Sequence, residues 1–192
     1  MNRTTGDKKP RCKDCSRKCI SKLTDCMVTY KDCEDVKLVK LLVYYLYYAP
    51  GIESVHAKDI PRELHENVFN RMVEGRHFLY GRFCAGDNNE MSRELKNGEL
   101  DGDAFCQKCK RYVCKKKRTA KGQIAESRLE CFLRHIRNAI AHGRIYYQHG
   151  GNRIHIVFED VTSRGNLSAR IVCIRSDLEY WRTILTDARY RA

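Results

Sequence analysis

The chain has 192 residues, and 42% of them are hydrophobic, a share that supports a folded core and argues against wholesale disorder. It contains 37 Lys and Arg against 24 Asp and Glu, which gives a formal net charge of +13. This surplus favours a polyanionic partner such as nucleic acid or an anionic surface, although a soluble protein that is merely basic has the same composition.

The longest apolar stretch, Leu38 to Ala49, is too short to cross a bilayer. It contains Lys40 and covers about 12 residues, whereas a spanning helix needs about 20 apolar residues. The segment from Met1 to Lys18 is polar and basic, without the apolar core of a secretory signal. We therefore expect a cytoplasmic protein that has no membrane partner.

The first part of the chain is expected to be a Cys-rich basic arm, residues 1–33, that includes a helix from about Asp14 to Asp32. The main domain then covers 34–192. Asp35 is suited to cap a second helix, Val36 to Tyr48, which Pro50-Gly51 ends. Helical spacing places four of its apolar residues toward the core: Val39, Leu42, Val43 and Leu46.

A third helix is expected to begin at Asp59-Ile60-Pro61, because Asp suits a helix cap and Pro suits the first turn. Its apolar stripe continues toward Phe83, and we expect it to end near Cys84. Residues 85–120 are acidic at first and then basic, and they read as an insertion with little regular structure. An insertion of this length is usually functional or disordered.

Regular structure is expected again from about Gln123. Apolar residues at helical spacing predict a helix that Gly143 ends. Residues 153–158 and 169–174 then alternate and are rich in β-branched side chains, and the stretch Ser163-Arg-Gly-Asn166 between them is typical of a turn. This pattern predicts a β-hairpin.

The chain is expected to end in a helix capped by Ser176 or Asp177, with an apolar face of Leu178, Trp181 and Leu185. The fold class predicted from these elements is mainly α. It is a helical bundle with one small β-hairpin before the C-terminal helix.

The residues best suited to chemistry lie near the end of the helix that Gly143 closes. Asn138 and His142 are four residues apart and share a helix face, and the long side chain of Arg137 can reach the same side. RNA cleavage by its own 2′-hydroxyl needs a base for the hydroxyl proton and a cation for the charge on the phosphate. His142 suits the first role and Arg137 the second, with Asn138 positioning them and no metal required. Helix ends also gather cations because of the helix dipole, so spacing alone leaves both interpretations open.

The phrase His135-Ile-Arg-Asn-Ala-Ile-Ala-His-Gly143 resembles the Arg-x4-His motif of the HEPN superfamily, especially that of abortive-infection-like bacterial members. Arg137, Asn138 and His142 match the motif positions, and the architecture is similar over roughly 35–192. The resemblance implies a metal-independent endoribonuclease that works as a homodimer with one composite active site. It also implies a toxin–antitoxin or phage-defence role, in which an antitoxin is a further partner. Some members only bind RNA or nucleotide, so a catalytically inactive binding module remains an alternative.

Neighbouring cations are expected to bind the substrate: Arg134, His135 and Arg144 beside the motif, and Lys115, Lys116 and Lys117 in the insertion. The run from Lys108 to Lys121 has eight Lys or Arg and no acid, which suits an RNA backbone. A solvated loop whose charge is offset by the preceding acidic stretch is the competing interpretation.

The eleven cysteines do not fit disulfides in the cytosol, where thiols stay reduced. Cys12/Cys15 and Cys106/Cys109 form two CxxC pairs that can supply four thiolates to a structural zinc ion, although they lie far apart in sequence. Cysteines also recur every seven residues from Cys12 to Cys33, which on a helix favours apolar packing. No cofactor is expected for catalysis. A zinc-stabilised interaction protein is the second alternative function.

Overall fold

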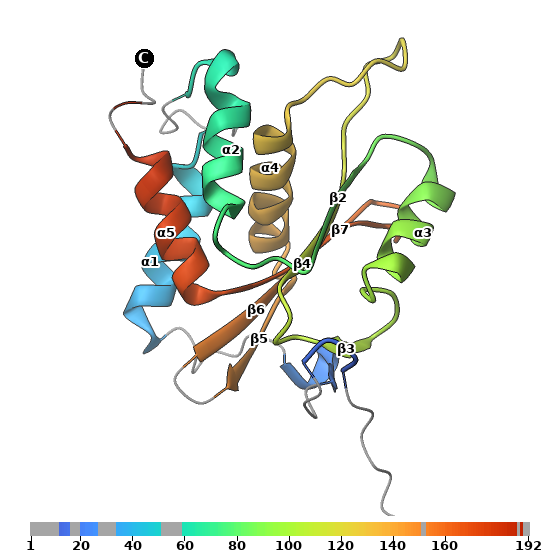
Figure 1. Ribbon diagram of the computed structural model, residues 1–192, viewed down its shortest axis with the longest axis vertical. Helices are drawn as coiled ribbons and strands as arrows, with labels where there is room; N and C mark the ends of the chain where they lie inside the picture. The colour runs from blue at the N-terminus through green and yellow to red at the C-terminus, as the bar shows by residue number, and fades with distance from the viewer. Residues whose placement is uncertain are drawn as a thin grey trace, which may run out of the picture.

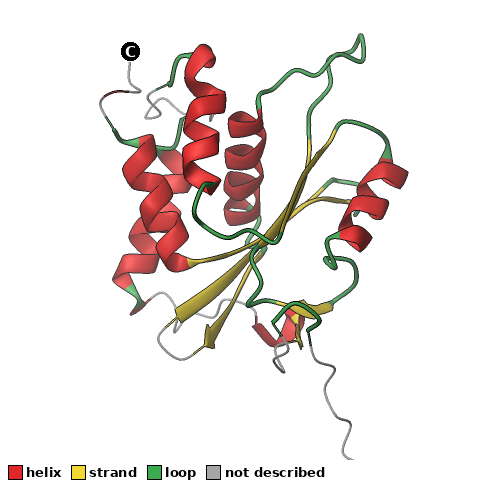
Figure 2. Cartoon of the chain, in the orientation of Figure 1, coloured by secondary structure: helices red, strands yellow, loops and turns green. Residues whose placement is uncertain are grey.

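The computed structural model describes residues 12–15, 20–26, 34–50, 59–150, 153–187 and 189. A five-stranded mixed sheet crosses the molecule, with helices on both faces (Figures 1 and 2). In chain order the elements are β1 Ile20–Lys22, the 3₁₀ helix η1 Leu23–Cys26, α1 Val36–Tyr47, the 3₁₀ helix η3 Arg62–Leu64, α2 His65–Val73, β2 Tyr80–Cys84, α3 Asn88–Asn97, β3 Ala104–Cys106, β4 Arg111–Lys115, α4 Arg128–Ala141, β5 Ile145–Gly150, β6 Arg153–Val161, β7 Leu167–Ile174 and α5 Arg175–Leu185.

The predicted mainly α fold class is wrong, because the structure is α/β. The strands of the sheet follow the order β2-β4-β7-β6-β5, with β2 and β4 parallel and the other neighbours antiparallel. The predicted hairpin exists as β6 and β7, but these are two strands of this larger sheet. A strand covered on both faces has apolar residues at consecutive positions and loses the alternation that marks a half-exposed strand. β4 is covered in this way, which explains why its sequence shows no strand alternation. β2 is instead a partly exposed edge strand, and it was expected to lie in the third helix because the apolar stripe of that helix continues toward Phe83.

Two cores lie on opposite faces of the sheet. Ile156 and Phe158 of β6 pack in the core beneath α1, α2, α4 and α5, while Val157 between them packs in the core beneath α3. Successive strand residues point to opposite faces, so one strand serves both cores. On the four-helix face, Phe132 of α4 makes edge-to-face contacts with Phe69 and Trp181. Each such pair contributes roughly 0.5–1.5 kcal/mol beyond burial.

Helix α1 begins as predicted, but it buries a different face. The side chain of Asp35 accepts hydrogen bonds from the backbone N–H groups of Lys37 and Leu38, both at 3.1 Å. The fully buried residues are Leu38, Leu41 and Tyr45, whereas Val43 is 42% exposed. Apolar residues surround most of this helix, so its spacing alone does not determine which face packs. No helix in the described ranges is both long and apolar enough to cross a membrane.

Several expectations for the first 120 residues are wrong. The described part of the predicted first helix contains β1 and η1, because Ile20–Lys22 pairs with β3 in a separate two-stranded sheet. The third helix ends at Val73, and Tyr80–Cys84 forms a strand. Residues 85–120, expected to have little regular structure, contribute α3, β3 and β4. These strands depend on partners distant in sequence, which local patterns do not show.

The elements around the motif match the sequence more closely. α4 starts with a capping box, in which Ser127 Oγ accepts from the Glu130 N–H at 3.2 Å and Glu130 Oε2 accepts from the Ser127 N–H at 2.6 Å. α5 begins slightly earlier than predicted, at Arg175, so Ser176 and Asp177 lie in its first turn and Ile174 is the cap residue. The Asp177 carboxylate accepts from the Ile174 N–H at 3.0 Å. Its predicted apolar face, Leu178, Trp181 and Leu185, is buried.

Candidate functional site

A shallow hollow of about 300 Å³ lies beside the C-terminal half of α4. Asn138 and His142 of α4 line it together with Asp160 of β6 and residues 115–117, which follow from the end of β4. The sheet therefore brings the motif helix and the basic run into one place, although they are separated in sequence. Arg137, the third motif residue, does not line this hollow.

The position of His142 is set by the way α4 ends. Gly143 has a φ of +65°, in the left-handed region that glycine adopts without strain. The Gly143 N–H donates to the Ile140 carbonyl at 3.1 Å and the Arg144 N–H donates to the Ala139 carbonyl at 2.8 Å. These two bonds form a Schellman motif. His142 is the exposed cap residue of this turn, so its ring stands at the open end of the helix.

Asp160 holds the motif asparagine in place. Its Oδ2 atom accepts from Asn138 Nδ2 at 3.1 Å and from His135 Nδ1 at 2.7 Å, and the residue is 6% exposed. Burial alone raises the pKa of Asp160, but the hydrogen bonds from His135 and Asn138 and the charge of Arg134 outweigh it and lower the pKa. The carboxylate is thus charged at neutral pH and fixes the Asn138 amide on the wall of the hollow.

Arg134 and His135, both expected to bind substrate, make contacts inside the protein. Arg134 forms a two-pronged ion pair with Glu126, with Nε–Oε2 at 2.8 Å and Nη2–Oε1 at 2.6 Å. His135 is 1% exposed, and its Nε2 lies 2.8 Å from the Lys115 carbonyl oxygen. Burial and the charge of Arg134 lower the pKa of His135, against the opposing effect of Asp160. These contacts fasten α4 to the end of β4, and a role in binding substrate stays a prediction.

The other two side chains that the motif offers for chemistry, Arg137 and His142, have no acidic partner among the described residues. Arg137 donates from Nη1 to Asn138 Oδ1 at 3.4 Å, and its buried Nε has no hydrogen-bond partner among the described residues. Within those same residues neither Arg137 nor His142 forms an ion pair. Asn138 therefore lies between a fixed carboxylate on one side and a guanidinium without a counter-ion on the other.

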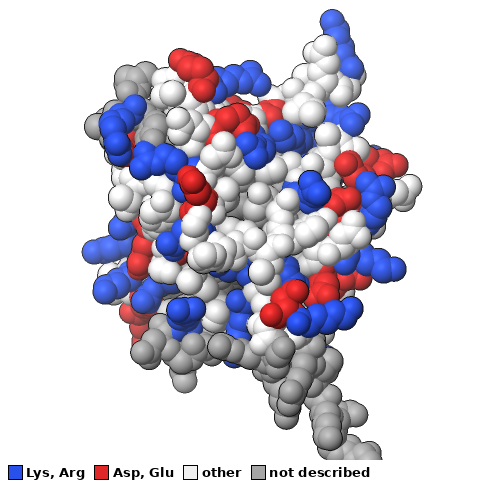
Figure 3. All heavy atoms as spheres, in the orientation of Figure 1, with Lys and Arg blue, Asp and Glu red and all other residues white. Residues whose placement is uncertain are grey.

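The other predicted substrate contacts surround the hollow loosely. Lys115 Nζ donates to Asn88 Oδ1 at 2.7 Å, Lys116 lies 5.7 Å from the centre of the Phe83 ring, and Lys117 is exposed. Arg144 is exposed and lies 3.7 Å from Glu159. On the face shown in Figure 3, basic side chains are interspersed with acidic ones and form no single block. The local excess of positive charge at residues 115–117 is thus a better indication of where a polyanion binds than the net charge of the whole chain.

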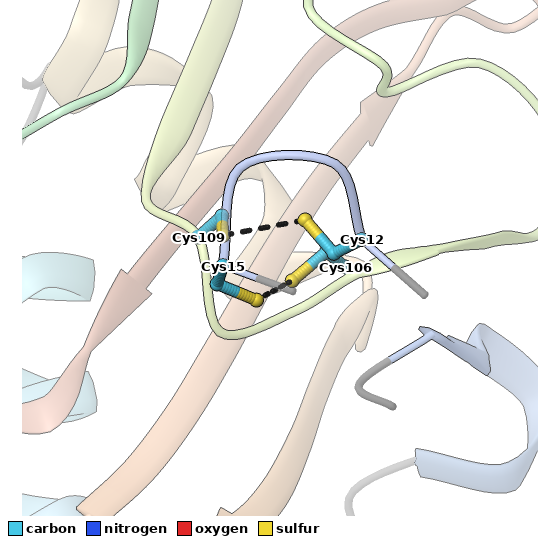
Figure 4. A group of neighbouring side chains, drawn as sticks. All are labelled: Cys12, Cys15, Cys106 and Cys109. Carbon is cyan, nitrogen blue, oxygen red and sulfur yellow. Dashed lines mark hydrogen bonds between the residues drawn. The ribbon is translucent and has the colours of Figure 1, made fainter. Parts of the chain in front are cut away.

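The four cysteines of the two CxxC pairs come together at a second place, near β3. Cys12 and Cys15 face Cys106 and Cys109, and all four sulfur atoms lie within 4.8 Å of one another (Figure 4). The predicted stripe of cysteines is not seen as a helix. Cys26 is buried in η1 beside Gln107, while Cys19 and Cys33 lie outside the described residues.

Sequence reasoning gave no role to Asp160 or Glu126, which hold the site together. A signal for Asp160 exists in the sequence, since it follows a run of buried apolar residues in β6. An acid in such a run is unexpected unless it is paired, because burying a charge is costly. Glu126 precedes α4 in a polar segment and offers no comparable signal.

The family HEPN pEK499 p136 matches residues 55–185. This range includes the motif, the hollow and all five strands of the central sheet. The chain belongs to this HEPN family. The HEPN resemblance drawn from the motif is thereby confirmed, and the family points to a nuclease or another RNA-related role. No curated protein and no solved structure matches the chain.

Proposed function

We propose that this HEPN protein is a metal-independent endoribonuclease whose reactive groups are His142 and Arg137. The observation that carries the proposal is that neither Arg137 nor His142 has an acidic partner in the described ranges, while Arg134 beside them is neutralised by Glu126. A site built for a phosphate requires a cation that no protein carboxylate already occupies. Asn138 contacts Arg137 and lines the hollow with His142, so it links the two.

The chemistry follows from the groups present. A His142 imidazole takes the proton of a ribose 2′-hydroxyl, and the oxygen attacks the adjacent phosphorus. The bond from phosphorus to the 5′-oxygen breaks, leaving a 2′,3′-cyclic phosphate on one product and a 5′-hydroxyl on the other. Arg137 stabilises the extra negative charge on the phosphate in the transition state. Lys116 and Lys117 would bind phosphates farther along the strand.

We further propose that the working form is a homodimer. Within one chain Arg137 lies outside the hollow that His142 lines. The exposed end of α4 and its turn, Ala141 to Arg144, is available to a second copy. When two such ends meet, the Arg137 of one chain can act with the His142 of the other, and the second His142 can protonate the leaving 5′-oxygen.

The direct test is cleavage of a panel of labelled RNAs without divalent cations and with excess EDTA. Wild type is compared with Arg137→Ala, His142→Ala and the control Arg164→Ala, which removes a cation from the exposed β6–β7 turn. We expect wild type and control to leave 2′,3′-cyclic ends, and each motif variant to lose roughly 10²- to 10⁴-fold in rate. The zinc content is measured after the assay, so that loss of a structural metal is not mistaken for loss of a catalytic one.

Three outcomes would overturn the proposal. Undiminished cutting by a folded His142→Ala protein would exclude His142 as the reacting group. RNA binding without cutting by wild type would indicate the catalytically inactive binding module, and neither binding nor cutting would indicate an interaction protein.

We also propose a toxin or phage-defence role with an antitoxin as partner, which the resemblance to abortive-infection-like members implies. Expression of wild type would then arrest growth of the host, and His142→Ala would relieve the arrest.

A further inference from the structure

The spacing of the four cysteine sulfur atoms matches a metal site. Cys12 Sγ lies 3.6 Å from Cys109 Sγ, and Cys15 Sγ lies 3.8 Å from Cys106 Sγ. A tetrahedral zinc ion with Zn–S bonds of about 2.3 Å places its sulfur ligands about 3.8 Å apart. A disulfide instead requires about 2.05 Å. We propose that Cys12, Cys15, Cys106 and Cys109 bind one zinc ion as thiolates.

The backbone presents these thiols in the way a structural site requires. Each CxxC pair spans a tight turn, one in residues 12–15 and the other between β3 and β4, and the sulfur atoms point toward one another (Figure 4). Cys12, Cys106 and Cys109 are each at most 5% exposed. Four protein ligands in a buried cluster leave no open position for water or substrate, so the ion has a structural role.

Arg111, the first residue of β4, donates from the sheet toward the cysteine cluster and toward two neighbouring acids. Four thiolates and one Zn²⁺ carry a net charge of about −2, which is costly to bury alone. Arg111 is 2% exposed, and its Nη2 lies 4.0 Å from Cys12 Sγ. It also pairs with Asp14 within the first CxxC turn and with Glu99 at 3.3 Å. Arg111 therefore acts as the outer partner that ties the cluster to the sheet.

The location of the cluster indicates what the zinc ion does. Cys12 and Cys15 precede the part of the chain that matches the HEPN family, whereas Cys106 and Cys109 lie inside it. The ion thus clamps the N-terminal segment onto the HEPN domain. The ion lies at the start of β4. At the other end of this strand, the carbonyl oxygen of Lys115 contacts Arg134 and His135. Loss of zinc is expected to loosen the start of this strand and to release the N-terminal segment.

The test measures metal content of the full chain purified without added zinc, and does not depend on nuclease activity. We expect about one zinc per wild-type chain, at most a tenth of that in Cys109→Ser, and a full equivalent in the control Cys26→Ala, which removes a buried cysteine outside the cluster. A Cys109→Ser protein that misfolds would also lose zinc, so wild type is loaded with Co²⁺ as an independent measurement. Absorption bands of tetrahedral, thiolate-bound cobalt are expected.

Three results would overturn the zinc site. These are less than half an equivalent of zinc in wild type as purified, cobalt spectra without thiolate bands, or a mass showing two disulfides in protein purified under reducing conditions. Unchanged zinc content in a folded Cys109→Ser protein would also reject the ligand set.

Discussion

At the scale of single residues, the site depends on which polar groups are already paired. Arg134 and Arg137 are three residues apart on one helix, yet Arg134 is bound by Glu126 and Arg137 has no acidic partner among the described residues. Asn138 donates to Asp160 and accepts from Arg137. A charged side chain that already has an ion-pair partner inside the protein must lose that partner before it can bind a phosphate. Breaking a buried ion pair costs several kcal/mol.

Asp160→Ala is expected to lower the rate of RNA cleavage more than it weakens RNA binding, because Asn138 loses the acceptor that positions it. The free energy of unfolding should also fall by about 1–3 kcal/mol, since His135 Nδ1 is left buried without an acceptor. Rates, KM values and urea unfolding of the variant give both quantities.

Two matched variants sharpen this test. Asp160→Asn keeps an acceptor oxygen and should retain more activity than Asp160→Ala. Asp101→Ala removes the same charge from an exposed loop, and it should change neither the rate of RNA cleavage nor the free energy of unfolding. Full cleavage by Asp160→Ala would show that Asp160 has no positioning role.

At the scale of elements, the buried His135 side chain connects α4 to two strands of the sheet at once, beside the contacts of Arg134 and Asn138. His135 contacts Asp160 of β6 and the carbonyl of Lys115 at the end of β4. Helix α4 also packs against α1 and α2 through Phe132 and its apolar neighbours. The polar contacts fix where the motif sits on the sheet, while the apolar contacts supply most of the stability.

This arrangement predicts a dependence of stability on pH. The pKa of His135 in the folded state is below its ordinary value of 6.5, mainly because of burial. Below pH 6.5 the unfolded chain therefore binds more protons than the folded one, and stability falls as the pH falls through this range. The depressed pKa of Asp160 adds a loss only below about pH 4.

Thermal midpoints between pH 7.5 and 5.0 measure this effect. His135→Gln cannot titrate, so its midpoint should fall less steeply with acidification than that of wild type. His155 also has a pKa lowered by burial and should preserve part of the slope in both proteins. Equal slopes would mean that His135 is not the group responsible.

At the scale of the whole molecule, the central sheet brings the parts of the candidate site together. Its strand order places the end of β4 near β6 and α4, so that residues 115–117 meet the motif. The cysteine cluster lies at the opposite end of β4. In the proposed homodimer, the exposed end of α4 that carries His142 would meet the same end of a second copy.

Mixing two kinds of chain tests the composite site. Wild type is allowed to exchange subunits with an equal amount of the double variant Arg137→Ala/His142→Ala. If both chains contribute to one site, the activity of the mixture should be about a quarter of that of wild type alone at the same total chain concentration. A quarter is the statistical share of dimers in which both chains are wild type. A fall to one half, with exchange shown by sedimentation of tagged chains, would mean that each chain has its own complete site.

Local signals in the sequence were sufficient to identify the motif and to locate the ends of several helices and strands. The cap at Asp35, the glycine at 143 and the turn at 163–166 all depend on groups within about four residues, so their chemistry can be read directly. The residues of the Arg-x4-His motif were recognisable for the same reason, and they led to the correct family.

Only the tertiary structure decided the fold class and the state of each candidate residue. Strand β4 is held by β2 and β7, which lie before and far after it in sequence, and a buried strand shows little local pattern of its own. The pairing of Arg134 with Glu126, and of His135 with Asp160, likewise depends on how α4 packs on the sheet. The two CxxC pairs form one cluster because β3 and the N-terminal segment lie side by side in the fold. The pairs are so far apart in sequence that local patterns could not show this contact.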